Sequence, residues 1–449
     1  MANGFAKATK NALKASPKAY DPRVGFAWDV TGKGDWVVRG GAGMYANWLS
    51  QANIQEEFRG NPPGLIMPTF FGGTGVNSPV FTQGSGSKPP FGFTYPPLAG
   101  TTLCPSAPCL DAKGGIPGAS PTIGGINPNI KTPSAFIWAG TLERKILNNF
   151  VGSVLYSGSH SRNLVANGNQ AGTVSYGADI NALPGDLLLH PNPVRLNSSF
   201  GVINYADNDR VANYEGVTFD FRGRARRAFF DVSYTRSSSK DDAGTGGAGI
   251  GNGSYPTTIN PHQFYGPSPW DVPNRFSFTF NYELAGLNGG HGAVGVLTGG
   301  WGLSGTAIYQ TGYPFTVLTT APFSAGGDYN ADGDNLDFPD VTSYHQGTSR
   351  SAFLNGVFTS GQFTPPTPGT NGNEKTQQFR QPSFAEADVT AYKDTHIGER
   401  VNLQLRFEFF NLFNHPNLFL DSNLANGSFG KATRQQLPRN WQIGGKLTF

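Results

Sequence analysis

The feature that most constrains the fold of this chain is an alternation of hydrophobic and polar residues along segments of about ten residues. In NRFSFTFNYEL (residues 274–284), Phe276, Phe278 and Phe280 share one parity, and polar residues occupy the other. RVNLQLRFEFF (residues 400–410) repeats the pattern. Successive side chains of a β-strand point to opposite faces of the sheet, so each segment has one hydrophobic face and one polar face. The pattern predicts an all-β protein made of long amphipathic strands.

The length of these segments favours strands that cross a membrane. They run for about nine to twelve residues, the length that a strand tilted by about 45° needs to cross a lipid bilayer. Strands of soluble proteins are usually about five or six residues long. We expect eleven antiparallel strands, at residues 22–30, 35–46, 134–144, 148–158, 212–222, 228–238, 274–284, 300–311, 384–395, 400–413 and 438–449.

The connections between the segments alternate between short and long. TGKG, KILNN, GRARR and HIGE are tight, and the long connections are 47–133, 159–211, 239–273, 312–383 and 414–437. Outer-membrane barrels have short periplasmic turns and longer extracellular loops, with aromatic girdles where their hydrophobic faces end. Because aromatic residues also crowd the ends of these hydrophobic faces, we expect an antiparallel transmembrane β-barrel in a Gram-negative outer membrane.

Composition agrees with this interpretation and excludes other classes. Charged residues make up only 14% of the chain, against roughly a quarter in typical soluble domains. No run of about 18 apolar residues occurs, which excludes a membrane-spanning helix. The net charge of +3 gives no indication of a nucleic-acid partner, and the first residues lack the apolar segment of a signal peptide.

The strand count predicts an incomplete barrel. If the short turns are periplasmic, the first strand (22–30) and the last (438–449) both run toward the periplasm. Single-chain bacterial barrels have an even number of strands, with both termini on one side. We therefore expect residues 22–449 to be the C-terminal part of a larger barrel and residues 1–21 to be the remnant of a preceding loop. The alternative is one strand missed or added, most simply within 47–133.

Five blocks of the sequence resemble, in order, blocks of the TonB-dependent transporter barrel. The resemblance extends from Pro22 to Phe449, and it is closest to the Oar-like branch, whose members carry an N-terminal carboxypeptidase-like regulatory domain. It implies a barrel of about 22 strands, of which this chain holds the last eleven, and a plug domain and a TonB-binding box that this sequence lacks. The blocks are DPRVGFAWDVTGKGDWVVRGGAGMY, ANYEGVTFDFRGRARRAFFDVSYTRSSSKDD, PWDVPNRFSFTFNYEL, GGWGLSGTAIYQTGYPFTV and GERVNLQLRFEFFNLFNHPN.

The resemblance implies active import of a scarce, bulky solute, such as an iron chelate, cobalamin or an oligosaccharide. The inner-membrane TonB complex, acting through the missing N-terminal region, supplies the energy. The other implied partners are outer-membrane lipid, the barrel-assembly machinery and a small-molecule ligand that the sequence does not identify. The last strand matches the family's assembly signal, at Trp441, Ile443, Leu447 and Phe449.

No catalytic constellation is present in the sequence. The seven histidines are scattered without an HExxH motif, and no GxSxG elbow occurs. We therefore expect no enzymatic activity and no cofactor. The alternative class is a secreted all-β carbohydrate-binding or adhesion protein, with strands nearer six residues and hydrophobic faces packed inward. Loops 47–133 and 312–383 carry many Phe, Tyr, Pro and Asn residues, which could grip a solute or pack against one another.

One predicted loop, DYNADGDNLDFPD, contains candidate calcium ligands. Asp328, Asn330, Asp332 and Asp334 occupy alternate positions, as the oxygen ligands do in the first half of a calcium loop. The twelfth position is Pro339 rather than Glu, which rules out an EF-hand. An ordinary acidic turn is the alternative.

The two cysteines, Cys104 and Cys109, lie close together in the Pro-rich segment LCPSAPCL. Such a pair fits a small disulfide in an oxidising compartment. Two unrelated thiols are the alternative.

Overall fold

The computed structural model describes the strands of this chain and parts of the connections between them. Each of the eleven predicted strand segments lies wholly or almost wholly within the described residues. The described residues are 20–47, 123–127, 129–147, 149–164, 168–170, 173–175, 178–179, 181, 197–200, 203–206, 208–242, 265–286, 292–319, 329, 337–367, 372–397 and 400–449.

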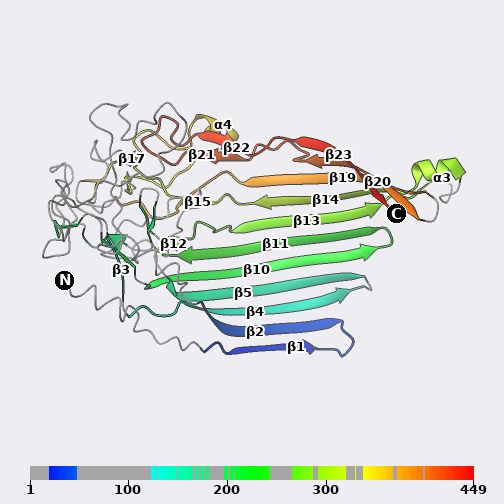
Figure 1. Cartoon of the computed structure of the whole chain (residues 1–449), viewed down its shortest axis with the longest axis horizontal. Coiled ribbons are helices and arrows are strands. Elements are labelled where there is room, and N and C mark those ends of the chain that lie inside the picture. The colour runs from blue at the N-terminus through cyan, green and yellow to red at the C-terminus, as the bar shows by residue number, and fades with distance from the viewer. Residues whose placement is uncertain are drawn as a thin grey trace, which may run out of the picture.

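Eleven long strands form one continuous antiparallel sheet, in which each strand pairs with the next long strand of the chain (Figure 1). All eleven predicted segments are therefore strands, and the all-β antiparallel fold is confirmed. The strands are β1 (Arg23–Asp29), β2 (Trp36–Ala46), β4 (Ser134–Ile146), β5 (Phe150–Leu164), β10 (Arg210–Ala225), β11 (Ala228–Asp241), β13 (Asn274–Glu283), β14 (Trp301–Gln310), β19 (Phe384–Ile397), β20 (Val401–Phe410) and β23 (Asn440–Thr448).

The two ends of the sheet differ, as the loop lengths predict. The hairpins β1–β2, β4–β5, β10–β11 and β19–β20 turn at the end drawn on the right of Figure 1, together with the short helix α3 (Gly292–Thr298) between β13 and β14. The described parts of the long connections lie at the opposite end. We call these the short-turn end and the loop end.

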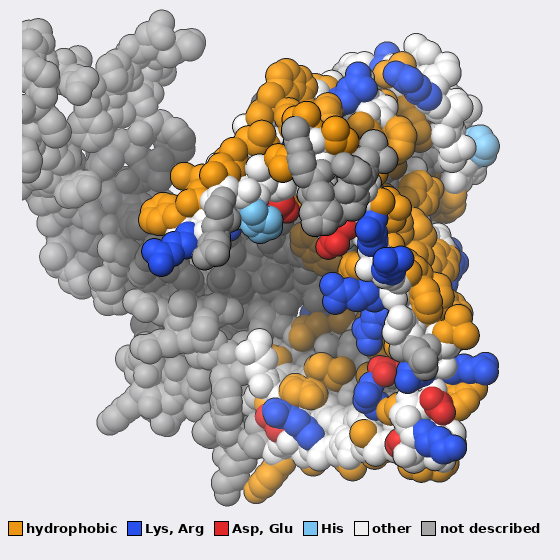
Figure 2. Space-filling view, turned by 90° about the vertical axis from the view of Figure 1, so that its right-hand side faces the viewer, with side chains coloured by type: hydrophobic (Ala, Val, Ile, Leu, Met, Phe, Trp, Pro, Cys, Tyr) orange, Lys and Arg blue, Asp and Glu red, His pale blue; other side chains and the backbone are white. Residues whose placement is uncertain are grey.

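The sheet is curved and open. Viewed from the short-turn end it forms an arc (Figure 2), and within the described chain β1 and β23 each pair on one side only. A membrane barrel must pair every strand edge, because lipid offers no hydrogen bonds to an exposed backbone. The eleven strands therefore form a stretch of barrel wall that does not close on itself.

The pairing register gathers the hydrophobic side chains on one face. A row of directly opposed residues crosses nine strands on this face: Trp28, Val38, Leu142, Val154, Phe219, Tyr234, Phe276, Tyr309 and Ala385. The next two strands continue the face with Phe409 and Trp441, which are directly opposed. In Figure 2 hydrophobic side chains cover much of the convex side of the arc.

These hydrophobic side chains are exposed, because no second layer covers them in the described chain. Trp28 is 59% exposed, Phe219 51% and Trp441 66%. The buried hydrophobic residues of the described chain all lie outside the eleven long strands. A soluble sandwich buries one face of each sheet, so this arrangement is that of a wall that contacts lipid.

The described hydrophobic core lies instead at the loop end. Two long connections, β14–β19 and β20–β23, pack together into a unit that we call the cap (described residues within 311–383 and 411–439). Its aromatic rings surround Phe358, whose ring centroid is 5.0 Å from those of Phe363 and Phe379. The buried core residues are Phe315, Val317, Val341, Val357, Phe363, Phe379 and Leu420. The described aromatic side chains of this core thus pack against one another.

Short elements complete the described chain. In the cap, β15 (Pro314–Phe315) pairs with β18 (Phe379–Arg380), β16 (Asp340–Val341) with β17 (Phe363–Thr364), and β21 (Leu418–Leu420) with β22 (Ala432–Gln435), beside helix α4 (Arg350–Asn355). Elsewhere the short strands are β3 (Ile123–Ile126), β6 (Gly168–Gln170), β7 (Thr173–Ser175), β8 (Ala178–Asp179), β9 (Ile203–Ala206) and β12 (Gly266–Pro267). No helix within the described ranges has the length and hydrophobicity to span a membrane.

Candidate functional site

The sheet offers two candidate sites, its polar face and a smaller cavity at its loop end. One row of directly opposed residues on the polar face consists of Asp29, Val37, Glu143, Ser153, Asp220, Ser233, Ser277, Ile308 and Glu386. Neighbouring side chains bond to each other across strands: Arg39 donates to Glu143, and the hydroxyls of Thr218 and Thr235 lie 2.8 Å apart. Such a face suits a water-filled interior, where charged groups stay hydrated.

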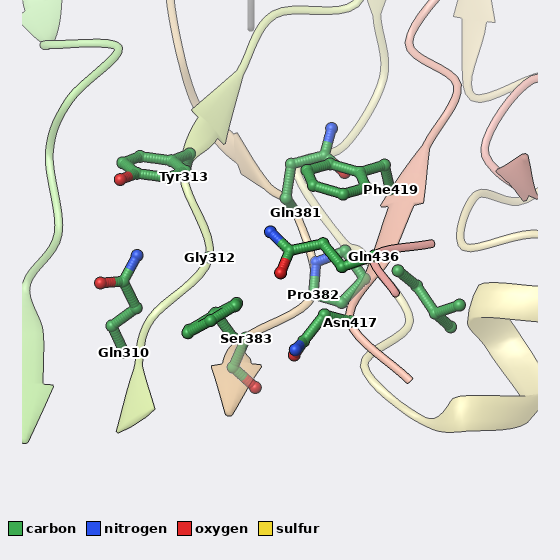
Figure 3. A pocket seen from close by; sticks show the side chains of 11 residues that line it. Gln310, Gly312, Tyr313, Gln381, Pro382, Ser383, Asn417, Phe419 and Gln436 are labelled. Carbon is green, nitrogen blue, oxygen red and sulfur yellow. The ribbon is translucent and has the colours of Figure 1, made fainter. Parts of the chain in front are cut away.

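A cavity of about 250 Å³ lies where the loop-end termini of β14 and β19 meet the cap (Figure 3). Gln310, the last residue of β14, and Phe384, the first of β19, are directly opposed on the polar face of the sheet. The remaining lining residues come from the cap or its junction with β19: Gly312, Tyr313, Gln381, Pro382, Ser383, Asn417, Leu418, Phe419 and Gln436.

Side-chain hydrogen bonds to the backbone fix the walls of this cavity. Asn417 accepts a bond from the N–H of Ala385 (2.9 Å) and donates to the Ala385 carbonyl (3.1 Å). Gln381 accepts a bond from the N–H of Leu420 (2.7 Å). A wall held in this way keeps its shape without a ligand.

Some polar groups of the lining remain free for a ligand. Within the described chain the side chains of Tyr313, Ser383 and Gln436 form no hydrogen bond, and Gln310 uses its Oε1 to accept from Arg275 (2.9 Å). The cavity therefore offers hydroxyl and amide groups beside aromatic rings. This combination can hold a neutral, polar solute by hydrogen bonds and ring contact.

An ion pair fastens the cap to the connection between β11 and β13. Arg380 pairs with the carboxylate of Asp271 and donates to the Asp271 carbonyl (3.0 Å) and to the Gly312 carbonyl (3.2 Å). The second carboxylate oxygen of Asp271 accepts a bond from the N–H of Ser239 (2.7 Å). Asp271 is almost fully buried, so this contact fixes the position of the cap relative to the sheet.

A second carboxylate lies inside the cap. Glu374 is 5% exposed, and its Oε1 accepts a bond from the N–H of Val317 (2.9 Å), while its Oε2 has no partner among the residues that the structure describes. Burial raises the pKa of Glu374 well above its usual range, because the charged form loses its hydration.

The structure places the predicted assembly residues together. Trp441, Ile443 and Leu447 lie on the hydrophobic face of β23, opposite Phe409, Phe407 and Leu403, respectively. They and Phe449 are exposed, with fractions from 57% for Leu447 to 94% for Phe449. This is the geometry that a lipid-facing strand requires, and the role of the four residues in assembly stays a prediction.

The other predicted sites lie outside the described residues. They are the calcium ligands Asp328, Asn330, Asp332 and Asp334 and the cysteines Cys104 and Cys109. Within the residues that are described, no group of three or more His, Cys, Asp or Glu side chains could hold a metal ion. The calcium site and the disulfide stay predictions.

Sequence reasoning missed the cavity and the Asp271–Arg380 pair. The two charged residues are 109 positions apart, each in a connection without periodicity. No local pattern marks either of them. Charged residues in long loops are usually solvated, so the sequence gives no signal for a buried pair.

Comparisons with known proteins bear on the fold. The family model described as outer membrane beta barrel domain matches residues 2–442. The outer membrane transporter YddB from Escherichia coli is similar in structure, with a TM-score of 0.52 and 10% identity, over 96% of this chain and 41% of that chain. The FrpB iron transporter from Neisseria meningitidis gives 0.44 and 11%, over 97% and 40%. The ferripyoverdine receptor of Pseudomonas aeruginosa gives 0.41 and 12%, over 96% and 33%.

These likenesses are distant in sequence. At 10% identity the likeness to YddB shows the fold alone. This chain spans less than half the length of each of the three structures. No curated protein sequence matches it.

Proposed function

This chain belongs to the family of outer membrane β-barrel domains, and from that premise we propose that it forms part of the wall of a transporter for bulky, scarce solutes. The protein lies in the outer membrane. Its likeness to YddB, itself an outer membrane transporter, supports transport as the activity. We propose no enzymatic role for the described residues.

One observation carries the proposal: the sheet has a hydrophobic face and a polar face that continue across all eleven strands. A wall of this kind separates lipid from a hydrated interior. The alternative, a secreted carbohydrate-binding or adhesion protein, requires short strands with inward-packed hydrophobic faces. β10 has 16 residues, and Phe219 at its middle is 51% exposed. The alternative therefore finds no support.

We assign the chain to the C-terminal part of a TonB-dependent transporter of the Oar-like branch. β1 and β23 both run toward the short-turn end, and each has a free edge in the described chain. These two observations support a larger barrel of about 22 strands, in which further strands pair with both edges. In that assembly a plug domain fills the interior, and the TonB complex drives its movement.

The solute enters from the loop end in this proposal. The cap and its cavity meet the solute first, and the polar face provides a hydrated wall for its passage once the plug has moved. Three solute classes fit the proposal: an iron chelate, cobalamin or an oligosaccharide. The amide and hydroxyl groups of the cavity can bond to a neutral, polar group at the edge of such a solute.

The test is uptake by the source bacterium or by a host that carries the complete gene. Cells receive a radiolabelled ferric chelate, cyanocobalamin or an oligosaccharide, with and without the gene and with and without functional TonB. We expect one of the three to accumulate only when both the gene and TonB are present. Uptake that persists without TonB would contradict energised transport, and recovery of the protein in the soluble fraction would contradict the barrel itself.

A further inference from the structure

The short-turn end carries a concentrated basic surface. The hairpins β4–β5 and β10–β11 contribute five exposed cationic residues, which we call the basic rim: Arg144, Lys145, Arg224, Arg226 and Arg227. Residues 144–150 and 222–230 contain no Asp or Glu. Figure 2, which looks onto this end, shows Lys and Arg side chains spread over it.

The two hairpins lie side by side, because β5 pairs with both β4 and β10. Phe150, the first residue of β5, is opposite Ile146 of β4 and Gly223 of β10. The N–H of Arg224 donates to the carbonyl of Asn149 (3.0 Å). The five cations therefore lie at the end of two adjacent hairpins, although the two turns are about 80 residues apart in sequence. Arg144 is on the hydrophobic face, Arg226 and Arg227 are in the turn, and Lys145 and Arg224 have the parity of the polar face.

Ion pairs within the described chain do not neutralise the basic rim. None of its five residues forms a salt bridge there, and the nearest acidic residue in sequence, Glu143, pairs with Arg39. The guanidinium of Arg144 lies over the ring of Trp36, 4.7 Å from its centroid. This contact holds the cation in place and leaves its N–H groups free for an anion.

The basic rim lies at the edge of the lipid-facing surface. Trp36 and Arg144 are directly opposed on the hydrophobic face, at the short-turn end of β2 and β4. Beside them the rings of Phe150, Phe221 and Phe230 contact one another, with centroids 5.5 to 6.1 Å apart. Aromatic rings at the end of a hydrophobic face mark the depth of the lipid headgroups. Arg144 lies in the same register row as Phe221, and Arg226 and Arg227 lie in the turn beyond the rings. Long cationic side chains at this depth extend into the headgroup layer.

We propose that the basic rim is a binding site for anionic phospholipid headgroups in the leaflet at the short-turn end. A guanidinium group can donate two parallel hydrogen bonds to two oxygens of one phosphate, and a phosphodiester offers two such oxygens. Basic surfaces of membrane proteins attract anionic lipids in this way. The continuity of the basic rim with the hydrophobic face favours a lipid over an acidic protein, because acyl chains already cover that face. This inference needs the membrane location and does not depend on transport.

The test is native mass spectrometry of the full chain, released from micelles that contain phosphatidylglycerol or phosphatidylcholine. We expect phosphatidylglycerol to bind in preference, and Arg144→Gln/Arg226→Gln/Arg227→Gln to weaken its binding at least tenfold. The matched control removes the same charge at the loop end, with Lys431→Gln/Arg434→Gln/Arg439→Gln. Circular dichroism and heat-dependent gel mobility establish that each variant is folded.

A second variant separates charge from folding. Arg226→Lys/Arg227→Lys keeps the charge of the turn and should retain most of the preference, whereas Arg226→Gln/Arg227→Gln should lose part of it. The proposal is overturned if both lipids bind equally to the wild-type chain. It is also overturned if the loop-end control weakens phosphatidylglycerol binding as much as the triple variant of the basic rim, or if the latter binds it like the wild type.

Discussion

The ion pair between Arg380 and Asp271 provides a quantitative test of how the cap is held on the sheet. The Arg380→Ala change removes the cation and two further hydrogen bonds, to the carbonyls of Asp271 and Gly312. The carboxylate of Asp271, with a side chain only 6% exposed, then keeps the N–H of Ser239 as its described partner. A buried charge left without its counter-ion is the costly part of this change.

The expected magnitude follows from burial. Breaking a buried ion pair by removing one partner costs about 3–5 kcal/mol. The side chain of Arg380 is 29% exposed, so water offsets part of the loss and the lower end applies, about 3 kcal/mol. Since about 1.4 kcal/mol corresponds to a factor of ten, opening of the cap should become about a hundredfold more frequent.

Amide hydrogen exchange of the protein in micelles measures this opening directly. Amides of the cap, including those of β18, the strand that contains Arg380, should exchange about a hundredfold faster in the Arg380→Ala variant. Amides at the centres of β10 and β11 should be unaffected. Arg434→Ala, which removes an exposed cap arginine without an ion pair in the described chain, is the control. Unchanged exchange in the cap of the Arg380→Ala variant would refute the reasoning.

Three further predictions concern the cap, the strands and the cysteines. Burial raises the pKa of Glu374 in the folded cap above its ordinary value of 4.5, so the folded cap binds this proton more tightly than the unfolded chain does. The stability of the cap should therefore fall as the pH rises above 4.5. Glu374→Gln should remove that fall, which thermal unfolding between about pH 4 and pH 8 would measure; a fall that persists would contradict it. A Cβ on Gly158 would lie 2.4 Å from the Trp138 ring, whereas one on Gly140 would meet nothing within 4 Å. Gly158→Ala should therefore destabilise the sheet by about 1–3 kcal/mol in urea titrations, and Gly140→Ala should not; equal effects would count against the register. Cys104 and Cys109 should react with an alkylating reagent only after reduction, as intact-protein mass would show, and alkylation without reduction would refute the disulfide.

The transmembrane strands could be predicted from sequence because lipid and water impose opposite demands on alternate residues. The side chains of Phe276 and Ser277 must face different solvents, and that requirement appears directly in the alternation. The prediction loses its accuracy where the requirement ends. β5 extends to Leu164, beyond the predicted end at residue 158, through SHSRN. These residues are polar on both faces, so no alternation marks the strand there.

The cap could not be predicted in this way. Phe315, Phe379 and Leu420 come from three separate stretches of the loops, and their contact depends on a path that no local pattern encodes. The same holds for the cavity, whose lining combines two strand termini with residues of two connections. The sequence indicated that the loops contain many aromatic residues and left open whether these bind a solute or pack together. The described core residues pack against one another.

The central claim is that the hydrophobic face of the sheet contacts lipid and the polar face contacts water. Phe278 and Thr279, adjacent in β13, point to opposite faces. Fluorophores are attached to Phe278→Cys and, separately, to Thr279→Cys, each in a chain without its two native cysteines and reconstituted in bilayers. Nitroxide-labelled lipid should quench the label at position 278, and iodide in water should quench the label at position 279. The reverse pattern, or equal quenching of both labels by either agent, would contradict the account.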